Sequence, residues 1–277
     1  MISVLLGIAT ALQWGLGALV LRPAARDAPP KTFAFWFAFY NTALMIIPGT
    51  LLIARDGLSL RAAAIGAVAA IAELIGITTY ARALERGDMV TVAPLVSLEG
   101  AFAAVIGITA GDAIGGMIGV ALALCVVGGL FLGLPGGIHL SAPGSGYAIG
   151  AAAGFGAMLW LVGGTGTNTV VLLLVLNAFD AVILAAAFRS KLSPAHTSKR
   201  THLLLAAAAA LNLGGLLAYS YGAVHGSLPV TAVLAAQFAV PAIIGGYVMH
   251  HERLTLTQGA GAVALICGVS LLAISGG

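Results

Sequence analysis

The chain is a succession of ten apolar runs separated by short polar connections. A helix needs about 20 apolar residues to cross the hydrocarbon core of a membrane. Backbone groups in lipid must bond internally, and the runs do not alternate at every second residue, so they predict helices. Charges, prolines and glycines place the ten predicted transmembrane helices at 3–21, 33–54, 62–84, 89–109, 114–134, 146–164, 168–188, 202–223, 228–249 and 256–274.

The composition agrees with a membrane environment. Only 8% of the residues are charged, 60% are hydrophobic, and the mean hydropathy is +1.08. A soluble domain carries about 25% charged residues, so most side chains here must face lipid or other helices. The 38 glycines favour close helix packing, which depends on small residues in lipid. We therefore expect an all-α, multi-pass integral protein of the cell (inner or plasma) membrane, with lipid as its surroundings and no nucleic-acid partner.

A pattern in the first half recurs in the second half at a constant distance of 139 residues along the chain. The matching pairs are Glu73/Asn212, Gly76/Gly215, Tyr80/Tyr219 and Gly87/Gly226. Looser matches, whose distance changes only in the connections, are Trp14/Trp160, Asn41/Asn177 and Cys125/Cys267. Insertions are best tolerated in connections. The pattern predicts that one five-helix unit occurs twice.

Five helices is an odd number, so the second unit must cross the membrane in the opposite orientation. The sequence therefore predicts two inverted five-helix repeats, residues 1–138 and 139–277, within one integrated membrane domain. Inverted repeats are typical of secondary transporters, whose substrate site lies near the midplane between the repeats.

Three acids lie inside the apolar runs, and Glu73 is central among them. An ionised carboxylate in mid-helix costs about 2.5–3.5 kcal/mol, so Glu73 must face a cavity, find a partner or be protonated. It is either a protonated structural acid or a residue that contacts substrate or binds a coupling proton. Asn212 at the matching position cannot titrate, so only the first half offers a proton switch. Asp180 shares a helix face with Asn177 and is expected to pair with it.

The third acid, Glu99, follows Pro94 in the fourth run and is a second candidate for proton coupling. A proline removes a helix hydrogen bond, and interrupted helices are typical of solute sites. Pro241, one turn after Gln237, gives the ninth run a similar device. Each proline is either a packing kink or a hinge, and Gln237 is a candidate cavity residue.

Aromatic residues inside the runs are further candidates for a substrate cavity. Trp14 and Trp160 lie well inside their runs, although Trp usually favours the membrane interface. They either pack in the core or face one another across a cavity. Tyr80 and Tyr219 are expected to offer hydroxyl groups to a shared pocket nearer a membrane face.

The sequence offers no enzymatic or metal-binding signature. Adjacent His250 and His251 point to different faces of a helix, and no third ligand follows at a suitable spacing. An HExxH motif, a Walker lysine and an aspartate-rich prenyl-diphosphate motif are all missing from the sequence. We therefore expect no enzymatic activity, no metal and no cofactor.

Positive charge is unevenly distributed between the two sides that ten spans define. The first side holds Arg22, Arg26, Lys31, Arg82, Arg86, Arg189, Lys191, Lys199, Arg200 and Arg253. The other side holds Arg55 and Arg61. The positive-inside rule taken alone places the first side in the cytoplasm and both termini outside.

Three stretches resemble the ten-helix EamA-like group of the drug/metabolite transporter superfamily. They are Leu12-Gln13-Trp14-Gly15, the segment from Tyr80-Ala81-Arg82-Ala83-Leu84 to Val92-Ala93-Pro94-Leu95, and Glu252-Arg253-Leu254-Thr255 with Gln258, Gly261 and Gly268. The resemblance implies an exporter or permease of two inverted repeats, with both termini in the cytoplasm. The first-half counterpart of the Glu252 motif is reduced to Gly111-Asp112. The resemblance also implies that the following residues line a central cavity: Trp14, Glu73, Tyr80, Glu99, Trp160, Asn212 and Gln237.

These observations together favour a secondary transporter of a small polar or amphipathic metabolite. We expect such a transporter to work by alternating access and to be coupled to protons through Glu73 or Glu99. An uncoupled channel or facilitator and a non-transport membrane module are the alternatives. The protein is expected to be a monomer or a homodimer.

Overall fold

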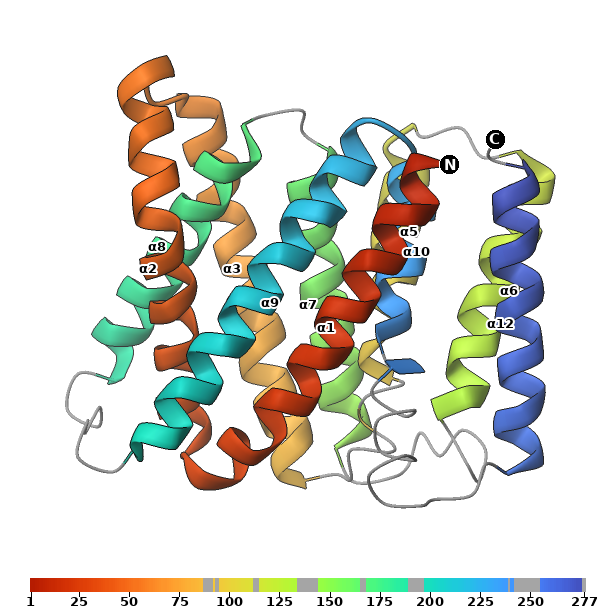
Figure 1. The fold of residues 1–277 in the computed structure, drawn as a ribbon, viewed down its shortest axis with the longest axis horizontal. Coiled ribbons are helices and arrows are strands. Elements are labelled where there is room, and N and C mark those ends of the chain that lie inside the picture. The colour runs from red at the N-terminus through yellow and green to blue at the C-terminus, as the bar shows by residue number, and fades with distance from the viewer. Residues whose placement is uncertain are drawn as a thin grey trace.

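The computed structural model describes residues 1–86, 92, 95–111, 115–133, 144–164, 168–188, 197–238, 240–241 and 255–275. Across these residues the chain forms ten α-helices and one short 3-10 helix (Figure 1). In chain order they are α1 (Ile2–Asp27), α2 (Pro30–Asp56), α3 (Leu60–Arg86), α5 (Glu99–Thr109), α6 (Gly116–Gly133), α7 (Ser145–Gly164), α8 (Thr169–Phe188), α9 (Lys199–Val224), α10 (Leu228–Ala235), η2 (Ala236–Phe238) and α12 (Leu256–Ser275). The predicted all-α class is confirmed.

Six of these helices are long and apolar enough to cross a membrane, judged by length and composition: α1, α2, α3, α7, α8 and α9. Four shorter apolar helices occupy the remaining predicted spans. Two of these spans are not one continuous helix. A turn at Ser97–Leu98 precedes α5, and α10 ends at Ala235 and passes into η2. Both irregularities lie in the interior of predicted runs.

The helices are arranged so that partners distant in sequence lie side by side. α1 packs on α9, α3 on α7, α2 on α8, and α6 on α12. In Figure 1, α2 and α8 form one edge of the bundle and α6 with α12 the opposite edge. The start of α1 and the end of α12 lie at the same end of the bundle.

Small residues bring α3 and α7 into backbone contact. A Cβ atom at Gly154 would lie 2.6 Å from the backbone nitrogen of Gly76. A Cβ atom at Gly76 would in turn meet the ring of Phe155. Close packing through glycine replaces the hydrophobic drive that is missing between helices in lipid.

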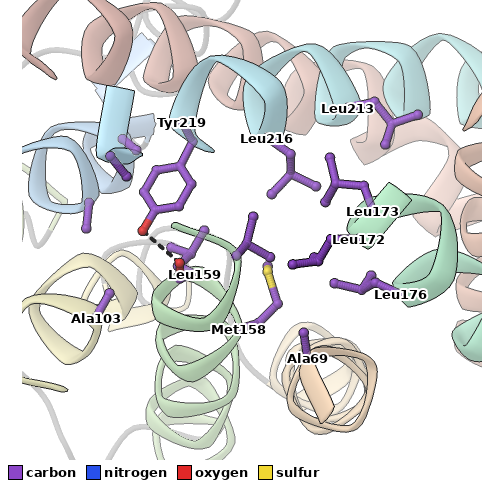
Figure 2. Close-up of a cluster of buried hydrophobic side chains, with 14 of the residues drawn as sticks. Ala69, Ala103, Met158, Leu159, Leu172, Leu173, Leu176, Leu213, Leu216 and Tyr219 are labelled. Atoms are coloured by element: carbon purple, nitrogen blue, oxygen red, sulfur yellow. Dashed lines mark hydrogen bonds between the residues drawn. The ribbon is translucent and has the colours of Figure 1, made fainter. Parts of the chain in front are cut away.

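Leucine-rich packing dominates the interior where α7, α8 and α9 meet (Figure 2). Leu159, Leu172, Leu176 and Leu216 are almost fully buried there. These long side chains interdigitate, so this part of the bundle is packed in the manner of a soluble protein core.

Candidate functional site

Trp14 of α1 forms a junction with the second half of the chain. Its indole Nε1 donates a hydrogen bond to the backbone carbonyl of Asn212 on α9, at 3.3 Å. The indole centroid lies 6.4 Å from the ring of Tyr219 on α9 and 6.4 Å from the ring of Phe238 on η2. A deeply placed Trp needs a partner for its N–H, and this arrangement supplies one.

The side chain of Asn212 points to a different neighbour. Its Nδ2 donates to Oδ1 of Asn41 on α2, at 3.2 Å. The Nδ2 of Asn41 donates in turn to the carbonyl of Phe37, at 2.8 Å. The two amides therefore satisfy one another without any charge.

Glu73 meets a second carboxyl group rather than Asn212. Its carboxyl group lies within hydrogen-bonding reach of that of Asp180 on α8. Asn177 donates instead to the carbonyl of Leu173, at 2.8 Å. The predicted pairing of Asp180 with Asn177 is therefore corrected: a tertiary contact with α3 supplies the partner of Asp180.

Glu99, the first residue of α5, is also buried. Its helix packs against α7 and α10. The Tyr219 hydroxyl donates to the carbonyl of Leu159 on α7 at 2.9 Å (Figure 2). Tyr80 is in edge contact with Phe155, with centroids 6.2 Å apart. Tyr219 is fully buried. That Tyr80 and Tyr219 offer hydroxyl groups to a shared pocket stays a prediction.

Gln237 lies at an interruption of the ninth span. Its backbone leaves helical geometry at φ −75° and ψ 15°, and its Nε2 donates to the carbonyl of Val233 at 3.0 Å. Pro241 has no N–H to offer the carbonyl four residues earlier, which is that of Gln237. The proline therefore explains the position of the interruption. The other predicted hinge, Pro94, lies outside the described residues.

Among the described residues, the rings of Trp160 and Trp14 make no contact with one another. It is partly buried and packs against the leucine-rich interior near Gly164. Its predicted role in a cavity stays a prediction.

A pocket that the sequence did not suggest opens where α3 ends and α7 begins. It has a volume of about 590 Å³, and Arg86, Gly144, Gly146 and Tyr147 line it. The guanidinium group of Arg86 lies 4.8 Å from the centre of the Tyr147 ring, in cation–π contact. Nothing in the sequence pairs these residues, because they lie on separate helices and neither belongs to a recognisable motif.

In the part of the chain that the structure describes, no three His, Cys, Asp or Glu side chains gather closely enough to hold a metal ion. His250 and His251, considered above for this role, lie outside the described residues.

The fold and the buried polar groups define an integral, multi-pass membrane protein whose halves meet in polar and aromatic contacts. Residues 1–134 match the EamA-like transporter family of the drug/metabolite transporter superfamily. That family consists of non-enzymatic membrane transporters of small molecules.

Known structures extend the likeness to the whole chain. Among 25 matching chains, one described as "Crystal structure of protein" superposes with a TM-score of 0.70. The match covers 99% of this chain and 97% of that one at 16% identity, and therefore concerns the fold alone. No curated protein matches the sequence.

Proposed function

We propose that the protein is a secondary transporter that moves a small polar or amphipathic metabolite by alternating access between two inverted halves, residues 1–138 and 139–277. The Trp14 junction carries this proposal, because it joins a first-half helix to α9 and η2 of the second half. An aromatic surface with a few polar groups suits an amphipathic solute. Secondary transporters bind their solutes at such contacts between repeats.

Helix pairing supports the duplicated arrangement. α1 packs on α9 as α7 packs on α3, α1 on α10 as α7 on α5, and α2 on α9 as α8 on α3. Each second contact follows from the first when every helix is replaced by its counterpart five spans away. The contacts α2/α8, α5/α10 and α6/α12 join counterparts directly.

Individual contacts support the same relation and revise one sequence match. A Cβ atom at Gly215 would collide with the indole of Trp14, and one at Gly76 would collide with the ring of Phe155. Gly76 and Gly215 are a matched pair, so these contacts favour Phe155 over Trp160 as the counterpart of Trp14. Trp160 shares its residue type with Trp14, but it lies five positions after Phe155, the residue that makes the equivalent contact.

The interruptions of the fourth and ninth spans also correspond. The turn ends at Leu98 in one span, and the non-helical residue is Gln237 in the other, again 139 residues apart. Interrupted helices expose backbone polar groups to a bound solute. In this proposal Pro241 and Pro94 allow the two spans to bend as the halves rock, and Glu73, Glu99 and Gln237 supply polar groups.

The charge distribution supports an orientation. The C-terminal ends of α1 and α3 and the N-terminal end of α9 lie at one end of the bundle. These helix ends carry Arg22, Arg26, Arg82, Arg86, Lys199 and Arg200. Only Arg55 and Arg61 flank the opposite end in the described chain. The positive-inside rule then places the basic end in the cytoplasm and the termini outside, opposite to the family resemblance.

The test is counterflow in proteoliposomes that contain the full-length protein, screened with radiolabelled amino acids, sugars and nucleotides. We expect trans-stimulated uptake of at least one class, and its loss in Trp14→Ala. Leu12→Ala is the matched control, because Leu12 lies on the same helix and is half exposed. Conductance without trans-stimulation would identify a channel, and no flux for any class would favour a non-transport module.

A further inference from the structure

Glu73 and Asp180 form an unusual contact between α3 and α8. Their carboxyl groups lie within hydrogen-bonding reach of one another, Asp180 is only 3% exposed, and Glu73 is partly buried. One oxygen of each carboxyl group, Oε2 of Glu73 and Oδ1 of Asp180, is buried without a hydrogen-bond partner among the described residues. A buried polar atom without a partner is costly, so these two oxygens call for a functional explanation.

In the described parts of the chain, no cation lies beside this carboxyl pair. Leu74 and Ile77 of α3 pack with Ala181 and Leu184 of α8, and with Ala38 of α2. α8 carries no other titratable side chain, and α7 carries only Tyr147. The remaining titratable groups of the packed helices are Lys31, Tyr40, Arg55 and Asp56 on α2, Arg61, Tyr80, Arg82, Glu85 and Arg86 on α3, and Lys199, Arg200, His202, Tyr219 and Tyr221 on α9. The charged groups among them all lie in the end turns of their helices, away from the carboxyl pair.

A hydrogen bond between two carboxyl groups requires a proton, because a carboxylate can only accept. When the proton leaves to water, two like charges remain in contact in an apolar interface. Mutual repulsion and the cost of burying two charges then oppose the contact. The contact between α3 and α8 is therefore conditional on the proton.

We propose that Glu73 and Asp180 together form one proton-binding site that joins the two halves of the protein, and that loss of its proton separates α3 from α8 at this point. This inference rests on the proposed transport function, and it makes the coupling site a pair with one member in each half. Glu99 takes no part in it, because it lies on α5, which packs against α7 and α10.

The first test is infrared difference spectroscopy of the purified full-length protein in lipid, titrated with pH at constant sodium. We expect a carbonyl band of a buried protonated carboxyl group that disappears as the pH rises. Either Glu73→Gln or Asp180→Asn should remove or displace the whole titration, and the double variant should leave none. The control is Asp56→Asn, since Asp56 is exposed and pairs with its neighbour Arg55 at 2.8 Å.

Two results would overturn the proton site. Additive, independent changes in the two single variants would mean that the acids titrate separately. Loss of the band on replacing choline with sodium at constant pH would mean that the two oxygens hold a metal cation instead.

The second test measures the separation of the helices. Spin labels at Arg82→Cys and Ala186→Cys, both exposed and at the same end of α3 and α8, are placed in a Cys267→Ser background. We expect the distance distribution to widen at high pH in this protein and to stay fixed when Glu73→Gln and Asp180→Asn are added. A distance distribution that does not change with pH in this protein, as in the double variant, would contradict the conditional contact.

These measurements need no transported solute, so the two proposals can fail separately. An intact proton titration without counterflow for any solute would sink the transport proposal and leave the pair standing. Counterflow in a protein whose carboxyl band never titrates would sink the pair alone.

Discussion

Two polar contacts at matching places in the two halves differ in one chemical property. Asn212 of α9 meets Asn41 of α2, whereas Glu73 of α3 meets Asp180 of α8. The amide contact is complete at any pH, because each amide carries both a donor and an acceptor. The acid contact is complete only with a proton. One side of the bundle is thus joined permanently and the other side conditionally.

The difference lies in the partners and not in the helices that carry them. Asn41 and Asn177 each donate to the carbonyl four residues earlier, Phe37 and Leu173, at 2.8 Å in both cases. Both helices make this local bond, but the residue of α8 that meets α3 is Asp180 and not Asn177. The carboxyl groups of Glu73 and Asp180 are what distinguish the second contact.

The largest effect is expected from Glu73→Gln. An amide in place of the carboxyl group keeps the shape of the contact and can donate to the Asp180 carboxylate, so the contact no longer needs a proton. We expect proton-coupled counterflow to fall to background and any residual flux to lose its dependence on pH. Initial rates at several pH values check this, and a full pH profile in Glu73→Gln would contradict it.

Asn212→Ala should have a smaller effect, because it breaks the permanent contact. The Oδ1 of Asn41 is then left without its donor, which costs about 1–3 kcal/mol. We expect a lower thermal unfolding temperature that is equally low at every pH. Thermal shift measurements across pH would reveal a dependence if the amide contact were conditional after all.

Trp14→Phe should be smaller again. The ring contacts with Tyr219 and Phe238 are retained, and only the hydrogen bond to the Asn212 carbonyl is lost. The expected cost is about 0.5–1.5 kcal/mol, with weaker binding of the solute rather than a changed pH profile. Apparent affinity and maximal rate in counterflow separate these effects, and Trp14→Leu provides the comparison without an aromatic ring.

The smallest effect concerns Asp27, which accepts hydrogen bonds from Thr201 and from Ser198 where α1 ends and α9 begins. The hydrogen bond from Thr201, followed by that from Ser198, holds the pKa of Asp27 below its ordinary value. A lowered pKa contributes stability that is present above the unfolded-state pKa and is lost as the pH falls through the folded-state pKa. This dependence is opposite in sign to that of the acid contact, which weakens as the pH rises.

We expect Asp27→Asn to lower the unfolding temperature slightly at neutral pH and not at all in strong acid. Unfolding curves at the two pH values provide the check. An equal shift in both would mean that the charge of Asp27 plays no part.

The sequence predicted the helical class because lipid leaves few choices for a backbone between charged ends. It also located the interruption near Gln237, since Pro241 removes a specific hydrogen bond. It did not predict the partner of Asp180, because Asn177 was the nearest polar group along the chain and the true partner lies on another helix. The acceptor of the Trp14 N–H was equally hidden: a backbone carbonyl exists at every residue, so no residue type marks it.

The glycines of α7 have a consequence for motion. A Cβ atom at Gly154 or Gly156 would run into the backbone of α3 or α5, so at these two positions the helices meet α7 backbone to backbone. Helices that meet through glycines can slide without separating large side chains, whereas the leucines in Figure 2 must change their packing before their helices can move. We therefore expect α7 to shift more easily against α3 and α5 than against α8 and α9. A methyl group added at Gly154 would hinder that shift.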